Sequence, residues 1–226
     1  MYKKNGFSLI ELVISLSVIS LLLGSSLILV NSIYKNNKTQ QDEILLNTIR
    51  ESLYGFAITH GRLPCPAENE NNLQSENCNL THGILPSVLL GVPKTDRFGN
   101  AISYYVNVAF SKPLEDDELC SFNLATGEGN DSVRKSLADI LADSNNKNDK
   151  LAIEVASVIV LHNARGKNSA NSNEQENSNN DTYFVSQAET QNFDDKVIWI
   201  TPYQLKYKVI ESGRLPYIYS IFYFSK

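Results

Sequence analysis

The sequence predicts an α+β fold, in which one long N-terminal helix packs on a globular domain built around an antiparallel-rich sheet. Three observations support this prediction. Residues 7–30 are strongly apolar, the first proline of the chain is Pro64, and short strand-like segments separated by turn residues follow Gly61. With 226 residues, the chain has the length of one domain beside such a helix.

The first half of the predicted helix is long enough to cross a membrane. Residues 7–30 are apolar apart from small residues, chiefly serine, and one acid, Glu11. As a helix this segment would extend about 36 Å, which covers a hydrocarbon layer of about 30 Å. The serines cost little, because a helical hydroxyl can bond back to the carbonyl group one turn earlier. Lys3 and Lys4 precede the segment, which by the positive-inside rule places the N-terminus in the cytoplasm.

Three simpler interpretations of residues 7–30 are open. A secretory signal peptide has an apolar region of only about 7–15 residues, although Gly24-Ser25-Ser26 resembles its small-residue cleavage site. The other two are a plain membrane anchor and a buried core helix. None of the three explains the acid at position 11.

Glu11 is the informative residue of this segment, because a carboxylate within a membrane span is costly and usually has a function and a cationic partner. No Lys or Arg follows it within two helical turns. Cleavage after Gly6 would create a cation, namely the α-amino group of Phe7. This amine would lie about one turn from Glu11 in the same helix, or would neutralise Glu11 of a staggered neighbouring helix and so set the axial register.

The segment Lys3-Lys4-Asn5-Gly6-Phe7-Ser8-Leu9-Ile10-Glu11-Leu12 resembles the N-terminal signal of type IV prepilins and type II secretion pseudopilins. The resemblance implies cleavage between Gly6 and Phe7, N-methylation of Phe7, and an assembly role for Glu11, the fifth residue of the mature chain (11 − 6 = 5). It therefore implies a pilin-like fold, with residues 1–6 as a leader peptide and residues 7–30 as the transmembrane and filament-core half of the helix.

Residues 31–60 are predicted to form the amphipathic half of the same helix. Gly61 and then Pro64 mark its end. The apolar residues of this half keep a three-to-four spacing, and they are Ile44, Leu45, Ile49, Leu53, Phe56 and Ala57.

Residues 61–226 are predicted to form a globular α/β head, located in the periplasm. Apolar and β-branched runs predict strands at 101–109, 151–161, 182–186, 197–200 and 217–224. Helical periodicity predicts a short turn of helix at 87–91 and a helix at 132–142. Thr201-Pro202 predicts the start of a helix that ends at Gly213, and the Asn/Ser-rich stretch 167–181 predicts a mobile loop.

Parts of the head extend the resemblance. The turn Asp96-Arg97-Phe98-Gly99-Asn100 resembles the Asp-x-aromatic-Gly-Asn turn of pseudopilins, and residues 60–66 and 193–199 resemble a subgroup of large prepilin-like proteins. The chain is larger than typical major pilins and lacks a clear disulfide-closed loop at its C-terminus, which favours a minor subunit.

The chain has three cysteines, Cys65, Cys78 and Cys120, and none is in a CxxC pair. Export of the head would permit one disulfide with one thiol left over. Of the three pairings we favour Cys65–Cys78, because the two residues flank one polar loop and a short loop is easily closed. The alternative is that all three are reduced core residues.

No motif predicts a catalytic residue, a cofactor or a metal ligand. His60, His82 and His162 lack ligand spacing and are interpreted as surface or capped residues. Gly166-Lys167-Asn168-Ser169 is no phosphate-binding loop, because the upstream Gly and the Ser or Thr directly after Lys are missing.

Two acidic runs and a group of tyrosines have alternative interpretations. Residues 115–118 and Asp194-Asp195 could bind Ca²⁺ through oxygen ligands, but we interpret them as solvated loops. Aromatic residues near the C-terminus are interpreted as core, with a partner-binding face as the alternative, and they are Tyr203, Tyr207, Tyr217, Tyr219 and Tyr223.

The expected function is structural, not enzymatic: a minor pilin or pseudopilin of a type IV pilus or type II secretion filament. Its expected partners are other pilin or pseudopilin subunits, prepilin peptidase and the inner-membrane assembly platform. The net charge of −5 argues against nucleic acid as a partner, except in a subunit for DNA uptake. The expected location is the bacterial inner membrane, with one span, or a periplasmic or extracellular filament. A binding module at a filament tip and an anchored periplasmic enzyme are the alternatives.

Overall fold

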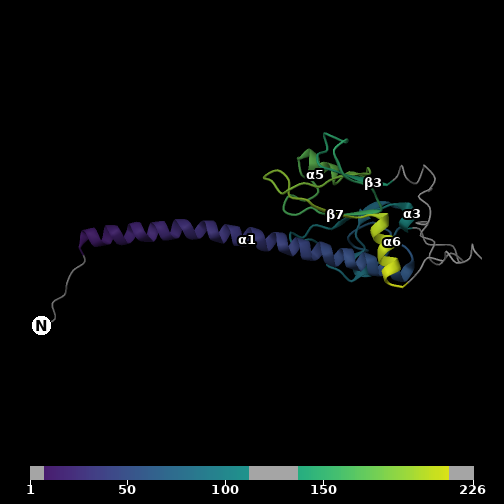
Figure 1. The fold of residues 1–226 in the computed structure, drawn as a ribbon, viewed down its shortest axis with the longest axis horizontal. Helices are drawn as coiled ribbons and strands as arrows, with labels where there is room; N and C mark the ends of the chain where they lie inside the picture. The colour runs from purple at the N-terminus through teal and green to yellow at the C-terminus, as the bar shows by residue number, and fades with distance from the viewer. Residues whose placement is uncertain (1–7, 112–136, 214–226) are drawn as a thin grey trace, which may run out of the picture. The chain divides into compact units, whose positions relative to one another are not determined.

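The computed structural model describes residues 8–111 and 137–213, apart from the side chains of residues 22–39. The chain forms two compact units, residues 1–44 and 45–226. Helix α1, Leu9–His60, runs through both (Figure 1). The fold is α+β with an antiparallel-rich arrangement of strands, as the sequence predicts.

Most of the described side chains of the first unit, those of residues 8–21, belong to the apolar start of α1. Ser15 and Ser20 each donate a side-chain hydrogen bond to the carbonyl oxygen four residues earlier, at 2.7 and 2.8 Å, which is the arrangement that makes helical serines compatible with an apolar segment. Among the residues described, no helix combines the length and the mean hydropathy that a membrane span requires. The transmembrane half of the helix stays a prediction.

In the second unit, α1 packs on the head through an apolar stripe. Ile49 and Leu53 are fully buried at its centre. The predicted member Ile44 is instead 59% exposed, and Leu46, 5% exposed, begins the buried stripe. The helix ends as predicted, because Gly61 adopts a left-handed φ of 70°, a conformation that favours glycine. The buried side chains are Leu46, Ile49, Leu53, Tyr54, Phe56 and Ala57.

In the described part of the chain, the main sheet has four antiparallel strands in the order β1-β2-β5-β7. Their bounds are β1 His82–Ile84, β2 Ser103–Val106, β5 Ser157–Leu161 and β7 Lys196–Ile200. Strand β5 is buried at every position, because both faces of this sheet are covered.

A second sheet has three strands in the order β4-β3-β6, where β3 pairs antiparallel with β4 and parallel with β6. The bounds are β3 Ala138–Leu141, β4 Lys150–Val155 and β6 Tyr183–Val185. The head therefore has three layers: the C-terminal part of α1, the four-stranded sheet and the three-stranded sheet (Figure 1).

Side-chain alternation along the central strands divides the core in two. Ile159 and Leu161 of β5 pack in the cluster that contains Ile49 and Leu53 of α1. Val158 and Val160 point to the opposite face and pack with residues of β3 and β6. This period of two is what a strand buried on both faces requires.

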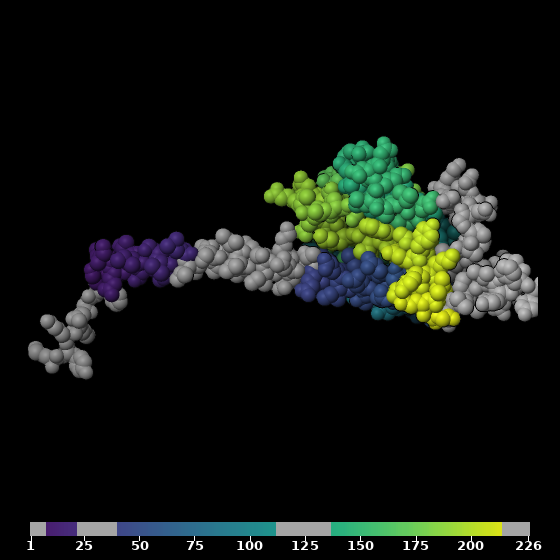
Figure 2. All heavy atoms as spheres, viewed as in Figure 1, coloured from purple at the N-terminus to yellow at the C-terminus, as the bar shows by residue number. Residues whose placement is uncertain are grey.

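Four short helices of the head lie among the described residues. They are α2 Ser87–Leu90, α3 Val108–Ser111, α5 Ser172–Glu176 and α6 Pro202–Glu211. Helix α6 begins as predicted, with Thr201 as N-cap in a capping box and Pro202 at the first position. Its Leu205 and Val209 join the cluster with α1, and the yellow spheres of α6 lie against the blue part of α1 in Figure 2.

The single strand predicted at 151–161 is wrong, because the structure divides this run into β4 and β5, which belong to different sheets. Val155 pairs with Ala138 in the small sheet, whereas Ser157 pairs with Ile200 in the main sheet. Glu154 has a φ of 54° and lies within β4, where the pairing register with β3 shifts. The chain bends at Ala156, between the two strands. An unbroken apolar run carries no signal for such a change of sheet.

The helix predicted at 132–142 is wrong in its described part, which is strand β3. Ala138 and Ile140 pack between the sheets, and Asp139 accepts hydrogen bonds from Lys150 Nζ at 2.8 Å and the Glu154 N–H at 3.2 Å. Pairing with neighbouring strands has overridden the local helical pattern.

Two further predicted elements differ from the structure, and a third lies outside the described residues. The strand predicted at 101–109 ends at Val106 and is followed by α3. The loop predicted at 167–181 contains helix α5, which is capped by the Asn171 side chain. The strand predicted at 217–224 lies outside the described residues.

Candidate functional site

The N-terminal site is described from residue 8 onward, so Gly6 and Phe7 lie outside the described residues. Glu11 lies in the first turn of α1 with an exposed side chain. Within the described part of the chain, no hydrogen bond or ion pair reaches its carboxylate. The apolar side chains around it are also exposed, and they are Leu9, Ile10, Leu12, Val13, Ile14, Leu16, Val18, Ile19 and Leu21.

Cys65 and Cys78 are joined by a disulfide, with an S–S distance of 1.95 Å and a Cα–Cα distance of 5.0 Å. The loop it closes is also held by Glu76, which forms an ion pair with Arg62 at 2.7 Å. Cys65, Glu76 and Cys78 are close enough together for metal binding, but the two sulfur atoms are bonded to each other and are not free ligands. Cys120 lies outside the described residues.

Asp96 organises the turn at residues 96–100 and ties it to the end of β5. Its Oδ1 accepts hydrogen bonds from the N–H groups of Phe98 and Asn100, both at 2.9 Å. Its Oδ2 accepts from the N–H of Asn163 at 2.9 Å. Asp96 is 5% exposed, so these charge-assisted bonds satisfy a buried carboxylate. The turn places Asn163, and with it the neighbouring His162, beside the main sheet.

A polar row crosses the edge of the main sheet next to this turn. Ser103 begins β2, His162 directly follows β5 and Asp195 directly precedes β7. These three strands are adjacent, and the register pairs Ser103 with Val160 and Leu161 with Lys196. The three residues therefore come from the same end of neighbouring strands.

The three side chains of this row are in contact. Ser103 Oγ lies 2.8 Å from His162 Nε2, and His162 Nδ1 lies 3.4 Å from Asp195 Oδ1. The side chains of His162 and Asp195 are both 0% exposed, whereas Ser103 is half-buried. Asp195 Oδ2 also accepts a hydrogen bond from Asn177 Nδ2 at 2.9 Å. Burial raises the pKa of Asp195, and its contacts with His162 and Asn177 oppose that increase.

Three carboxylates form a second cluster beside the row. Glu174, Asp194 and Asp195 each offer one oxygen atom within 4.8 Å of the others. Within the described residues, Glu174 Oε2, Asp194 Oδ1 and Asp195 Oδ1 are buried without hydrogen-bond partners. Oxygen atoms this close could share a Ca²⁺ ion at about 2.3–2.6 Å. These residues are the ones suited to hold a hard divalent cation.

The electrostatics of this cluster are unfavourable when all three acids are charged. Burial, together with the nearby charges of Glu174 and Asp195, raises the pKa of Asp194 to about 6. Arg165 Nε lies 3.8 Å from Glu174 Oε1 and compensates part of the charge.

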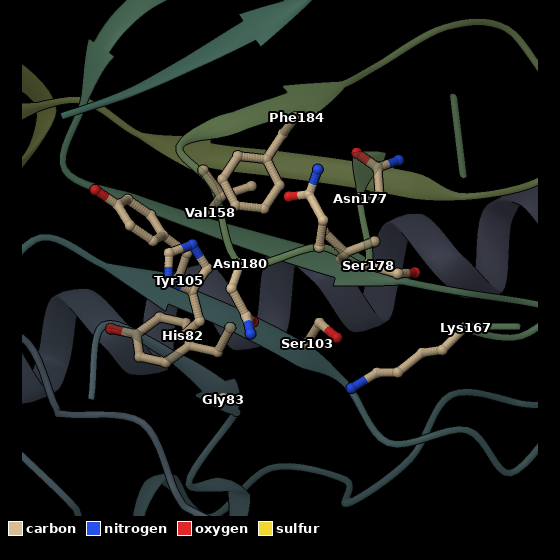
Figure 3. Close-up of a pocket in the computed structure, with 13 residues that line it drawn as sticks. His82, Gly83, Ser103, Tyr105, Val158, Lys167, Asn177, Ser178, Asn180 and Phe184 are labelled. Atoms are coloured by element: carbon tan, nitrogen blue, oxygen red, sulfur yellow. The ribbon is translucent and has the colours of Figure 1, made fainter. Parts of the chain in front are cut away.

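A cavity of about 100 Å³ opens between the two sheets at Ser103 (Figure 3). Tyr105, Phe184 and His82 form its aromatic side, with ring centroids 4.8 Å apart for His82 and Tyr105. Lys167 and the amide side chains of Asn177 and Asn180 give it polar groups. Burial lowers the pKa of His82, although a hydrogen bond with the Asp181 carbonyl opposes this.

One comparison identifies the N-terminus. Residues 1–27 match the family model of the prokaryotic N-terminal methylation motif, which is the signature of type IV prepilins and pseudopilins. The motif supports a type IV pilin-like or pseudopilin subunit that assembles with other pilin subunits and is processed by prepilin peptidase. Comparison of the chain with curated proteins and with solved structures gave no match.

Several predicted roles in the head change. His162 is buried and not a surface residue, and Asp195 is 2% exposed and does not lie in a solvated loop. The default interpretation of Tyr203 and Tyr207 as core is wrong, since they are 83 and 63% exposed. The acidic run 115–118 and the tyrosines beyond residue 213 lie outside the described part of the chain.

The sequence contained a signal for the polar row. His162 directly follows the strand predicted at 151–161, and Asp195 lies two residues before the strand predicted at 197–200. Residues at the facing ends of adjacent antiparallel strands meet at one edge of a sheet. Ser103, Glu174 and Asn177 were not predicted as members of the site, because nothing local in the sequence shows which strands are neighbours.

Proposed function

We propose that this chain is a minor pilin or pseudopilin, a structural subunit of a type IV pilus or type II secretion filament. The observation that carries the proposal is the start of α1 together with the matched motif. Nine large apolar side chains between Leu9 and Leu21 are each at least 50% exposed. They occupy all faces of the helix, and a helix that is apolar all round requires an apolar surrounding.

The surrounding that we propose is lipid before assembly and neighbouring subunits after it. The large apolar side chains of α1 between Leu9 and Leu21 are exposed, and Leu46 is the first buried one among those described, so the turns at residues 9–21 are available to other chains. On this proposal prepilin peptidase removes residues 1–6, and the inner-membrane platform adds the subunit to the filament. The head lies in the periplasm.

Glu11 supplies the specificity of this packing. Its carboxylate is exposed on an otherwise apolar surface, which is costly in lipid without a cationic partner. Cleavage after Gly6 supplies that partner as the α-amino group of Phe7. Pairing between the amine of one chain and Glu11 of the next would define the axial step between subunits.

Intact-mass analysis of the membrane form tests the proposal. The chain should be expressed with and without prepilin peptidase. With the peptidase we expect loss of residues 1–6 and one added methyl group on Phe7, and without it the full-length chain. A chain that still begins at Met1 in the presence of peptidase, or one cut near Ser26 as by signal peptidase, would contradict the proposal.

A further inference from the structure

In the row Ser103–His162–Asp195, the acid lies beside one ring nitrogen of the histidine and the serine beside the other. This order determines which of the groups donates a proton to the histidine. A carboxylate beside Nδ1 favours the histidine tautomer with its proton on that nitrogen. Nε2 then has a free lone pair, so the hydroxyl of Ser103, 2.8 Å away, donates its proton toward it. This leaves the lone pairs of Ser103 Oγ directed away from the histidine, as in a serine prepared for nucleophilic attack.

The surroundings hold the histidine and its carboxylate in place. Asn177 Nδ2 donates to Asp195 Oδ2 at 2.9 Å, and the N–H of Asn163 is held by Asp96 at 2.9 Å. The 3.4 Å between His162 Nδ1 and Asp195 Oδ1 exceeds an ordinary hydrogen bond, but such bonds are often long in unliganded enzymes and shorten when substrate binds.

Only the serine end of the row reaches open space. His162 and Asp195 have no exposed side-chain surface, whereas Ser103 lines the cavity of about 100 Å³ (Figure 3). Ser103 is therefore the member of the row that a ligand in the cavity contacts first, and His162 Nε2 is reached through the position next to its hydroxyl.

The same cavity contains groups that can stabilise an oxyanion. Lys167 and Asn180 line it together with Ser103 (Figure 3). Within the described residues, the ammonium group of Lys167 has no ion pair with an acid; burial lowers its pKa, and the nearby charge of Glu70 opposes that decrease. An ammonium or amide donor that reaches a carbonyl oxygen in the cavity would stabilise the negative charge that develops there during attack.

We propose that the head carries an acyl-transfer site, in which Ser103 is the nucleophile, His162 the general base and Asp195 the group that orients it. The volume of the cavity limits the substrate class to esters of short acyl groups. This activity is additional to the structural role of the chain and does not depend on it.

The reaction follows from the geometry. Ser103 Oγ attacks the ester carbonyl carbon as its proton passes to His162 Nε2. The tetrahedral intermediate expels the alcohol, which takes that proton, and an acyl group remains on Ser103. Water, deprotonated by the same nitrogen, then releases the carboxylic acid and restores the serine.

Labelling of the purified full chain with a fluorophosphonate probe tests the site. We expect the label on Ser103, located by peptide mass spectrometry, and hydrolysis of p-nitrophenyl acetate faster than that of p-nitrophenyl decanoate. Ser103→Ala should abolish labelling and lower hydrolysis by about 10²- to 10⁴-fold, the usual contribution of such groups. Ser212→Ala, at the end of α6 and outside the cavity, should retain both.

A second variant distinguishes a catalytic role of the row Ser103–His162–Asp195 from a purely structural one. Ser103→Cys should keep the fold and place a reactive thiol at the same position. We expect iodoacetamide to modify this thiol faster in Ser103→Cys than in the double variant that also carries His162→Gln. Absence of probe on Ser103 in the folded wild type, or equal acetate hydrolysis by wild type and Ser103→Ala, would overturn the proposal.

Discussion

The carboxylate of Asp96 accepts a hydrogen bond from the N–H of Asn163, 67 residues further along the chain, at 2.9 Å. This bond connects the turn at residues 96–100 to the end of β5, where Asn163 adopts a left-handed φ of 47°. One buried side chain therefore holds both the turn and the loop that carries His162.

Substitution of Asp96 should destabilise the head strongly. Asp96→Ala leaves the buried N–H of Asn163 and the partly buried N–H of Asn100 without acceptors, so we expect a loss of about 3 kcal/mol in the free energy of unfolding. Urea denaturation of the full chain measures it. Asp149→Asn, at an exposed position, is the control and should stay within about 0.5 kcal/mol of wild type. Equal effects of the two substitutions would contradict the role assigned to Asp96.

Truncation of two apolar residues of α1 should change the stability of the head by very different amounts. Leu53 is 0% exposed, so Leu53→Ala should cost about 2–5 kcal/mol through lost burial and a cavity. Ile44 is 59% exposed, so Ile44→Ala should change the stability of the head by less than about 0.5 kcal/mol. Thermal unfolding followed by circular dichroism compares them. A large loss for Ile44→Ala would place the start of the buried stripe one turn earlier.

Loss of the Cys65–Cys78 disulfide should destabilise the head, because this bond closes the loop that follows α1 in the chain. The bond spans 13 residues, and closing a loop of this size in the unfolded chain contributes about 3 kcal/mol. We expect Cys78→Ser to lower the urea midpoint by the corresponding amount. Reductant should shift wild type and Cys120→Ser equally and leave Cys78→Ser unchanged. A reductant effect that disappears in Cys120→Ser would indicate a different pairing.

The stability of the head should decrease as pH rises from about 4 to about 6. Burial and the neighbouring acids raise the pKa of Asp194 from its ordinary 3.8 to about 6. The folded state therefore keeps a proton that the unfolded state has already lost in this range, and stability falls with increasing pH. Asp194→Asn should reduce this slope and gain stability relative to wild type above pH 6. Parallel pH profiles for the two proteins, from chemical denaturation, would contradict the assignment.

Glu11→Val should separate membrane insertion from assembly. The valine removes a carboxylate from an apolar surface, so insertion should remain intact, but the amine of a neighbouring subunit loses its partner. We expect filament incorporation, measured by shearing and immunoblotting in an assembling host, to be abolished or slowed. Glu43→Gln, exposed on the same helix, should assemble normally. Normal incorporation of Glu11→Val would count against the ion-pair mechanism.

Local signals predicted much of this fold. The end of α1 at Gly61 and the start of α6 at Thr201-Pro202 follow from backbone preferences that act within a few residues. The division of residues 151–161 between two sheets was not predictable, because a single residue, Ala156, separates the two strands and no local signal marks a change of sheet there. The N-terminal motif was recognisable because its residues are contiguous, whereas Ser103, His162 and Asp195 meet only through the strand order.

The excursion between β5 and β7 leaves the main sheet at His162 and returns to it at Asp195, next to its point of departure. Its two ends are held side by side by strand pairing, so lengthening an exposed turn within it adds little loop-closure entropy. The excursion also contains β6 and the buried Phe184, which belong to the small sheet and its core, so it cannot be replaced as a whole. The exposed turn at residues 188–192 is instead the place where an engineer can graft a recognition loop and leave both sheets intact.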